Sequence, residues 1–305
     1  MLILCNDSNS IYSDFLTCKN SPKSLRLLVV TGNIFKYMDM ETFLAHHQVF
    51  TIKEARIALG IEKSGSTLNN LLAYHIQRGH LIRIRKGLYY TIPRGANPKN
   101  HPIDPYLITS KMTLDASLAY HTSLGFHGKL HSLRNDFIYI THKKIKPPFI
   151  FRNIVFKGIS IPKRTLFNPD FGIEIVDYQG CKIRVTTLER TFVDVLDRPT
   201  LIGSWEEIWR SLESIEYLNL EKVIAYAEIL NNVTTYARIA FFLDQHRERF
   251  TLLEKDLLFF DTFKPKSPHY LDRHSKEPNQ LINRWNLIVP KSLLQRTWEE
   301  PNENF

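Results

Sequence analysis

The stretch that decides the fold of the first part of the chain is residues 51–92, which read TIKEARIALGIEKSGSTLNNLLAYHIQRGHLIRIRKGLYYTI. Thr51 and Glu54 have the spacing of a capping box, in which a hydroxyl and a carboxylate satisfy exposed amides at the start of a helix. A short helix is therefore expected over 53–59. Gly60 is expected to end this helix. A second helix is expected over 67–78, with Gly79 at the position where helices commonly end.

The helix expected over 67–78 has two different faces. At 100° per residue, one stripe is apolar and predicts a core face: Leu68, Leu71, Leu72, His75 and Ile76. The remaining positions offer the candidate DNA-binding side chains, namely Thr67, Asn69, Asn70, Tyr74, Gln77 and Arg78. Asn and Gln can pair with adenine edges in a major groove. For an isolated helix, a solvated polar face is the more common explanation.

The segment that follows changes this balance. Apolar residues alternate with Arg83 and Arg85, Lys86 begins a tight turn, and 88–92 returns as a second strand. Two short helices followed by a basic hairpin form the winged-helix arrangement, in which the second helix enters the major groove and the hairpin reaches phosphates or the minor groove. We predict a winged helix-turn-helix DNA-binding domain over 39–95. The alternative is a winged helix used only for protein contacts.

The rest of the chain is expected to form an α+β domain over 101–295, after a breaker-rich linker at 93–98. A helix is expected over 114–124. Strands are expected at 137–141, 154–156, 159–161, 173–176 and 182–185, and helices at 187–196, near 205–215, and at 219–230, 234–246 and 252–260. The order is strands first and helices after, not a repeating βαβ pattern. Residues 1–38 have little periodicity and are expected to be a poorly ordered extension, or the result of a translation start assigned too early.

Several stretches carry a family resemblance. Residues 185–199 read VTTLERTFVDVLDRP, residues 203–207 read GSWEE and residues 284–290 read RWNLIVP, and the turn at Lys86 continues as KGLY. Over about 40–295, the chain resembles the AbiEi antitoxins of bacterial type IV toxin–antitoxin systems.

This resemblance implies a transcriptional autorepressor that binds inverted repeats of double-stranded operator DNA. It also implies a C-terminal antitoxin domain that counteracts a nucleotidyltransferase-like toxin without a stable complex. Such systems often act in abortive infection, a phage defence. The resemblance further implies a protein that is not an enzyme. Neutralisation of the toxin by direct contact is the first alternative, and a nucleic-acid-processing enzyme is a less favoured one.

Enzyme signals are weak in this sequence. Residues 60–67 imitate a phosphate-binding loop, but Ser66 replaces the required lysine. Asp170 and Glu174 could suggest the paired carboxylates of a nuclease. The lysine expected two residues after the second carboxylate is absent, because Val176 stands there. The histidines follow no metal-binding spacing, so neither a metal nor a cofactor is expected.

The most enzyme-like charges lie in the family stretch, at Glu189, Arg190 and Asp194. Glu189 is interpreted as the acidic member of a second capping box that begins at Thr186. Arg190 and Asp194 are four residues apart on one expected helix and can form an intrahelical pair worth roughly 0.2–0.5 kcal/mol. A structural role is favoured, and catalysis is the alternative.

Charge is unevenly distributed along the chain. The net charge is +9, and residues 129–164 hold 9 basic side chains and 1 acidic one. An auxiliary basic surface is expected there, formed by Lys143, Lys144, Lys146, Arg152 and Lys157. It either contacts nucleic acid or consists of lysines that protect strand edges from aggregation.

Cysteine usage and hydropathy bear on the compartment. The three cysteines, Cys5, Cys18 and Cys181, form no paired motif, and no apolar run is long enough to cross a bilayer. A cytoplasmic protein without a membrane partner is therefore expected.

Overall fold

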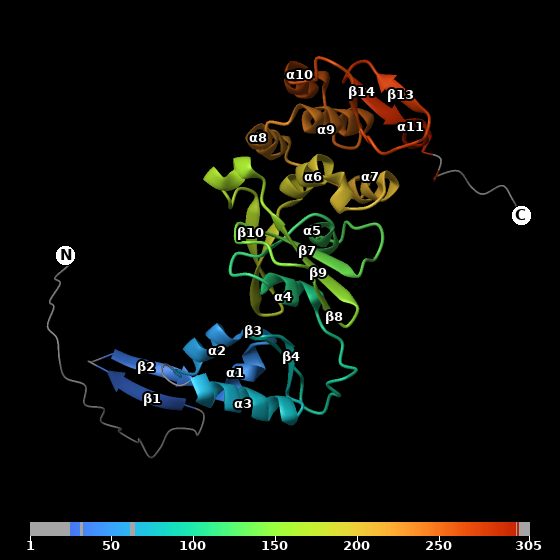
Figure 1. Ribbon diagram of the computed structural model, residues 1–305. Coiled ribbons are helices and arrows are strands. Elements are labelled where there is room, and N and C mark those ends of the chain that lie inside the picture. Colours follow the sequence, from blue (N-terminus) through green and yellow to red (C-terminus); the bar gives the residue numbers. More distant parts are fainter. Residues whose placement is uncertain (1–24, 31–32, 62–64, 297, 299–305) are drawn as a thin grey trace, which may run out of the picture. The chain divides into compact units, whose positions relative to one another are not determined.

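The chain folds into two compact units, and the structure, a computed structural model, describes residues 25–30, 33–61, 65–296 and 298 (Figure 1). Contacts divide the chain into Met1–Ile103 and Asp104–Phe305. Each unit is described by itself.

In its described residues, the first unit has three helices and two small antiparallel sheets. Its elements are β1 (Leu25–Val30), β2 (Asn33–Met38), α1 (Met40–His46), β3 (Val49–Thr51), α2 (Ile52–Ala58), α3 (Gly65–Gln77), β4 (Leu81–Arg85) and β5 (Leu88–Thr91). The expectation of little regular structure in 1–38 was wrong for its last part, because β1 and β2 pair as a hairpin. Apolar and β-branched residues in both strands favour this pairing. Residues 1–24 lie outside the described part of the chain.

The three helices of the first unit pack on the sheet β3-β5-β4. The expected capping box is confirmed: Glu54 N donates to Thr51 Oγ1, and Thr51 N donates to the Glu54 carboxylate at 2.7 Å. Gly79 has φ +75°, which is the left-handed conformation expected where α3 ends. Buried side chains from every layer close this core: Phe43, Phe50, Ala55, Leu68, Leu72, Leu81 and Tyr89.

The second unit is built on a mixed sheet of six strands in the order β10-β11-β6-β7-β9-β8. Its elements are α4 (Pro105–Ser110), β6 (Ser117–Leu118), α5 (His121–Phe126), β7 (Asp136–Thr141), β8 (Phe149–Phe151), β9 (Ile154–Ser160), η1 (Lys163–Phe167), β10 (Ile173–Tyr178) and β11 (Cys181–Thr186). The pairs β11–β6 and β7–β9 are parallel, and the others are antiparallel.

The helix expected over 114–124 was wrong. Ser117 and Leu118 form a central strand, and a separate helix begins at His121. The backbone of Tyr120 has φ +54°, which breaks any continuous helix at that residue. The helical spacing of the small residues here reflects burial on both faces of the central strand instead.

A layer of helices follows the six-stranded sheet along the chain and leads to a small three-stranded sheet in the order β12-β14-β13 (Figure 1). These elements are α6 (Leu188–Asp197), η2 (Pro199–Leu201), α7 (Trp205–Glu213), α8 (Leu220–Leu230), α9 (Val233–Gln245), α10 (Glu254–Thr262), β12 (His269–Tyr270), β13 (Asn279–Ile282), β14 (Leu287–Pro290) and α11 (Lys291–Gln295). Helix α6 packs against α5, α8 and α9 and is the centre of this layer. The mixed α+β layout agrees with expectation, except that strands β12–β14 come after the helices.

Candidate nucleic-acid interface

Helix α3 buries one face and exposes the other. The apolar stripe expected from the sequence is confirmed, since Leu68, Leu72 and His75 are buried. All six candidate side chains on the rest of the helix are exposed: Thr67, Asn69, Asn70, Tyr74, Gln77 and Arg78. The Arg78 guanidinium lies over the Tyr74 ring, 5.5 Å from its centroid. The helix therefore presents three amides and two hydroxyls on its outer side, with one cation just after its end.

The hairpin of β4 and β5 carries the second group of candidates. Arg83 and Lys86 are exposed, whereas Arg85 is partly buried. The register shifts between Arg83 and Arg85, which indicates a β-bulge, and Ile84 within the bulge is buried. Ile84 is thus buried between the two arginines, as the alternation in the sequence predicted.

The tip of this hairpin is hydrogen-bonded to the start of α2. Gly87 has φ +80°, which a side-chain-bearing residue rarely adopts, and its carbonyl accepts a hydrogen bond from Ile52 N at 2.9 Å. Ile52 is the first residue of α2. This bond fixes the turn that carries Lys86 against the start of the second helix.

The candidates for an auxiliary basic surface lie in the second unit, along the β7–β8 connection and strands β8 and β9. Lys143, Lys144, Lys146 and Arg152 are exposed, and Lys157 is partly buried. Because β8 is an edge strand of the six-stranded sheet, these cations lie at or near an edge. The Arg152 guanidinium lies 5.6 Å from the centroid of the Phe151 ring. Both explanations offered by the sequence, edge protection and nucleic-acid contact, are compatible with this placement.

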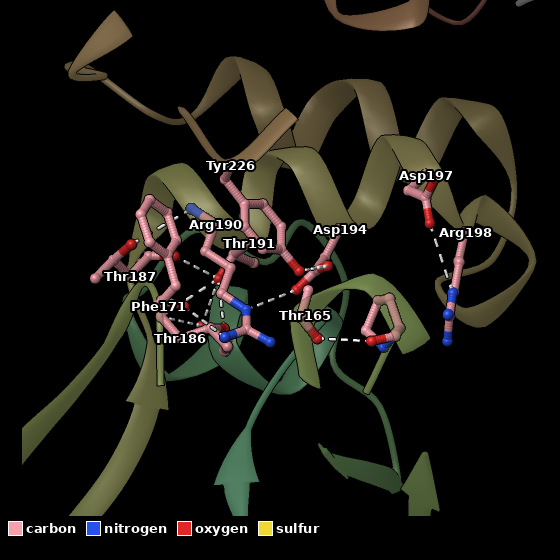
Figure 2. Close-up of polar contacts among 12 residues, drawn as sticks. Thr165, Phe171, Thr186, Thr187, Arg190, Thr191, Asp194, Asp197, Arg198 and Tyr226 are labelled. Atoms are coloured by element: carbon pink, nitrogen blue, oxygen red, sulfur yellow. Dashed lines mark hydrogen bonds and ion pairs between the residues drawn. The ribbon is translucent and has the colours of Figure 1, made fainter. Parts of the chain in front are cut away.

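The family-motif charges Arg190 and Asp194 form a buried pair on α6 (Figure 2). Their side chains are 1% and 2% exposed, and Arg190 Nε lies 3.4 Å from Asp194 Oδ2. Arg190 Nη1 also donates to the backbone carbonyl of Phe171 at 2.5 Å, and the guanidinium lies 5.0 Å from the centroid of the Tyr226 ring. The expected i,i+4 pair is therefore present, but both of its charges are out of water, where the small free energy of an exposed helical pair does not apply.

Burial dominates the electrostatics of this pair. Removal from water raises the pKa of the Asp194 carboxyl, while the charge of Arg190 and the hydroxyl of Tyr226 oppose the shift. Tyr226 donates that hydroxyl to Asp194 Oδ1 at 2.7 Å. The Tyr120 hydroxyl and Arg190 Nη2 are buried without a hydrogen-bond partner among the described residues. The cluster is enclosed between α6, α8 and the segment that precedes β10.

Glu189 does not cap its own helix, which corrects the second capping box. The residue at the start of α6 is Thr187, whose hydroxyl accepts from Arg190 N at 3.3 Å. Glu189 Oε1 instead accepts from Asn219 N at 3.3 Å, at the beginning of α8. The N-cap was misplaced by one residue, and since the third residue after Thr187 is Arg190, α6 begins with a capping threonine but without a capping box.

Arg238, on α9, is a charged residue that sequence reasoning did not single out. Burial lowers the pKa of its guanidinium to about 10. Its Nη1 donates to the carbonyl of Leu196 at 2.8 Å and its Nη2 to that of Leu271 at 2.7 Å. Arg238 thus satisfies the C-terminal end of α6 and joins it to the β12 segment.

Two further features of the described residues bear on the class of site. Within the described ranges, no group of three or more His, Cys, Asp or Glu side chains is placed to hold a metal ion. No helix in that part of the chain has both the length and the apolar character needed to cross a membrane.

Comparisons with known proteins bear on the fold of the chain and on the family that residues 38–92 resemble. The crystal structure of the RV2827C protein from Mycobacterium tuberculosis superposes with a TM-score of 0.53 at 16% identity. The match covers 83% of this chain and 90% of that one, and it establishes similarity of fold. A search of curated proteins finds no match. Residues 38–92, which hold α1–α3 and the sheet β3-β5-β4, match the family model described as a transcriptional regulator, AbiEi antitoxin.

Proposed function

We propose that this chain is a DNA-binding antitoxin that represses its own type IV toxin–antitoxin operon. The observation that carries the proposal is α3, whose outer face consists of exposed Asn, Gln, Thr and Tyr side chains while its inner face is buried. The basic hairpin of β4 and β5 follows directly. Together with α1 and α2 over 39–95, these elements have the order of a winged helix.

In this proposal, the two groups of candidates have different tasks. Helix α3 enters the major groove, where Asn70 and Gln77 read base edges, because their amides can donate and accept together. Arg83 and Lys86 on the hairpin contact phosphates, which fixes position without reading sequence. Inverted repeats in the operator would then accommodate one copy of the chain on each repeat.

The second unit, over 101–295, acts in this proposal as the antitoxin domain. Its target is a nucleotidyltransferase-like toxin, which it counteracts without a stable complex and without catalysis of its own. The exposed cations Lys143, Lys144, Lys146 and Arg152, with Lys157, provide an auxiliary surface for nucleic acid. The burial of Arg190 and Asp194 supports a structural role for the most enzyme-like charges.

A gel-shift assay with the DNA upstream of the chain's own operon tests this function. For about 6–8 phosphate contacts, the logarithm of affinity should fall with the logarithm of salt concentration with a slope of roughly −5 to −7. Absent binding, or binding that is insensitive to salt, would overturn the proposal. Co-purification of a stable complex with the toxin would instead favour neutralisation by direct contact.

A further inference from the structure

A cavity of about 420 Å³ in the second unit has an unusual concentration of positive charge. It lies where η1, the end of α6 and the connection from α8 to α9 meet. Its lining includes three cations, Lys163, Arg164 and Arg198, and one carboxylate, Asp197. None of these residues belongs to the candidate DNA-binding face of α3 or to the auxiliary surface of Lys143–Lys157.

The carboxylate in the cavity is already engaged. Asp197 Oδ1 accepts from Asn232 Nδ2 at 3.0 Å and from Thr235 Oγ1 at 2.6 Å, and its Oδ2 lies 3.6 Å from Arg198 Nε. These donors satisfy Asp197 from three directions. The uncompensated charge of the cavity is therefore positive.

The two arginines are held in place by backbone carbonyls. Arg164 Nη1 donates to the carbonyls of Leu230, at 2.5 Å, and of Asn231, which end α8. Arg198 Nη1 donates to the carbonyl of Ser160 at 3.3 Å. Because carbonyls carry no net charge, these bonds orient both guanidinium groups and leave the charge of Arg164 available to a ligand, whereas Arg198 also pairs with Asp197.

Lys163 and the start of α9 complete the cationic side of the cavity. Lys163 is exposed and forms no hydrogen bond or ion pair with any other residue that the structure describes. Helix α9 begins at Val233, which lines the cavity, so the positive end of this 13-residue helix lies at the cavity, where Asn232 already accepts from Thr234 N at 3.1 Å. Oxyanions are favoured in such an environment.

An exposed aromatic ring lies on the same 3-10 helix as two of the cations that line the cavity. Phe167 is 97% exposed, although aromatic side chains of this size usually contribute to the core. It is three residues after Arg164 in the 3-10 helix η1, and with three residues per turn the two side chains leave the helix on the same side. Phe167 does not itself line the cavity, but an exposed ring on the same side of η1 as a cavity-lining arginine is suited to stacking an unpaired base next to its phosphate.

We propose that this cavity binds the phosphate of a nucleotide or of single-stranded nucleic acid, with the adjoining base stacked on Phe167. Lys163, Arg164 and Arg198 contact the phosphate oxygens. The site does not depend on operator binding by the first unit. It adds to the antitoxin domain a binding site for unpaired nucleotides.

Fluorescence anisotropy and calorimetry on the full chain test this site with four probes: inorganic phosphate, adenosine monophosphate, and eight-residue single strands of RNA and of DNA. Lys163→Glu reverses the one cation that no described residue engages, so the fold should persist, and affinity for every probe should fall roughly tenfold or more. Phe167→Ala should weaken the three base-containing probes at least fivefold and leave inorganic phosphate unchanged. Lys264→Glu changes the same charge at an exposed lysine outside the cavity and should have no effect.

The probes also separate the possible sources of the phosphate. Binding of the mononucleotide alone identifies a free nucleotide, whereas tighter binding of RNA or DNA strands identifies a nucleic acid. Binding that survives Lys163→Glu, or no binding of any probe, would overturn the proposal, and so would equal effects of Phe167→Ala on all four. Operator gel shifts with the same variants should be normal, so a failure here is distinguishable from failure of the proposed function.

Discussion

Tyr226 donates its hydroxyl to Asp194 at 2.7 Å, and this hydrogen bond joins α8 to α6 inside the second unit (Figure 2). Arg190 lies on the other side of the same carboxylate and also binds the segment before β10. One buried acid therefore holds three parts of the chain together. The charges that most resemble an active site form a structural junction.

Removal of the buried acid should destabilise the protein strongly. Asp194→Ala leaves Arg190 as an uncompensated buried charge, and we expect the free energy of unfolding to fall by about 3–5 kcal/mol. Tyr226→Phe, which removes only the hydroxyl, should cost about 1–3 kcal/mol. Urea denaturation followed by circular dichroism measures both losses.

The matched control for this experiment is Glu206 on α7, which pairs with Arg210 at the same i,i+4 spacing but in partial contact with solvent. Glu206→Ala should cost no more than about 1 kcal/mol. If Asp194→Ala and Glu206→Ala cost the same, the proposed junction does not exist. Retained stability together with the loss of a measurable activity would favour catalysis instead.

Gly172 should be required by the same junction. Its φ is +63°, and a Cβ at this position would lie 2.8 Å from Cβ of Arg190. Gly180 has a similar φ of +75°, but nothing lies within 4 Å of an added Cβ. Both alanine variants carry the strain of a positive φ, about 1 kcal/mol or slightly more. We expect Gly172→Ala to lower the thermal midpoint clearly more than Gly180→Ala, and equal losses would contradict the close contact.

Sequence reasoning succeeded where the determining interactions are local. The faces of α3 and the capping of α2 by Thr51 follow from spacings of three or four residues. It failed at β6, because Ser117 pairs with Arg184, which is 67 positions later. The environment of Arg190 could not be predicted for the same reason, since its carbonyl partners come from the segment before β10. Strands as short as β12 have too few residues for a recognisable alternation.

Stability of the first unit should depend on pH through His75. Burial and the neighbouring His80 ring, with Nδ1 atoms 3.2 Å apart, lower the pKa of His75, while Glu41 opposes the shift. Because the folded pKa lies below the ordinary value of 6.5, the unfolded chain takes up the proton first as pH falls. The contribution of neutral His75 is therefore complete above pH 6.5 and is lost progressively below it.

The size and origin of this effect can be measured. The free energy of unfolding should decrease as the pH falls below about 6.5, with a slope of at most about 1.4 kcal/mol per pH unit from this group. His75→Leu removes the titrating ring and should flatten that part of the profile for the first unit. An unchanged slope in His75→Leu would show that another group is responsible.

The two groups of DNA-binding candidates should respond differently to substitution. Arg83 is expected to contact phosphate, so Arg83→Ala should weaken binding to all duplexes alike and reduce the steepness of the salt dependence by about 1. Asn70 is expected to contact a base edge, so Asn70→Ala should reduce discrimination between operator and unrelated DNA by about 1–3 kcal/mol.

Lys99→Ala, at an exposed lysine after the hairpin, is the control. Since Arg83 and Asn70 are both exposed, neither substitution should alter folding, and gel shifts at several salt concentrations distinguish the two effects. A uniform loss from Asn70→Ala would mean that α3 positions the protein on DNA without reading its sequence.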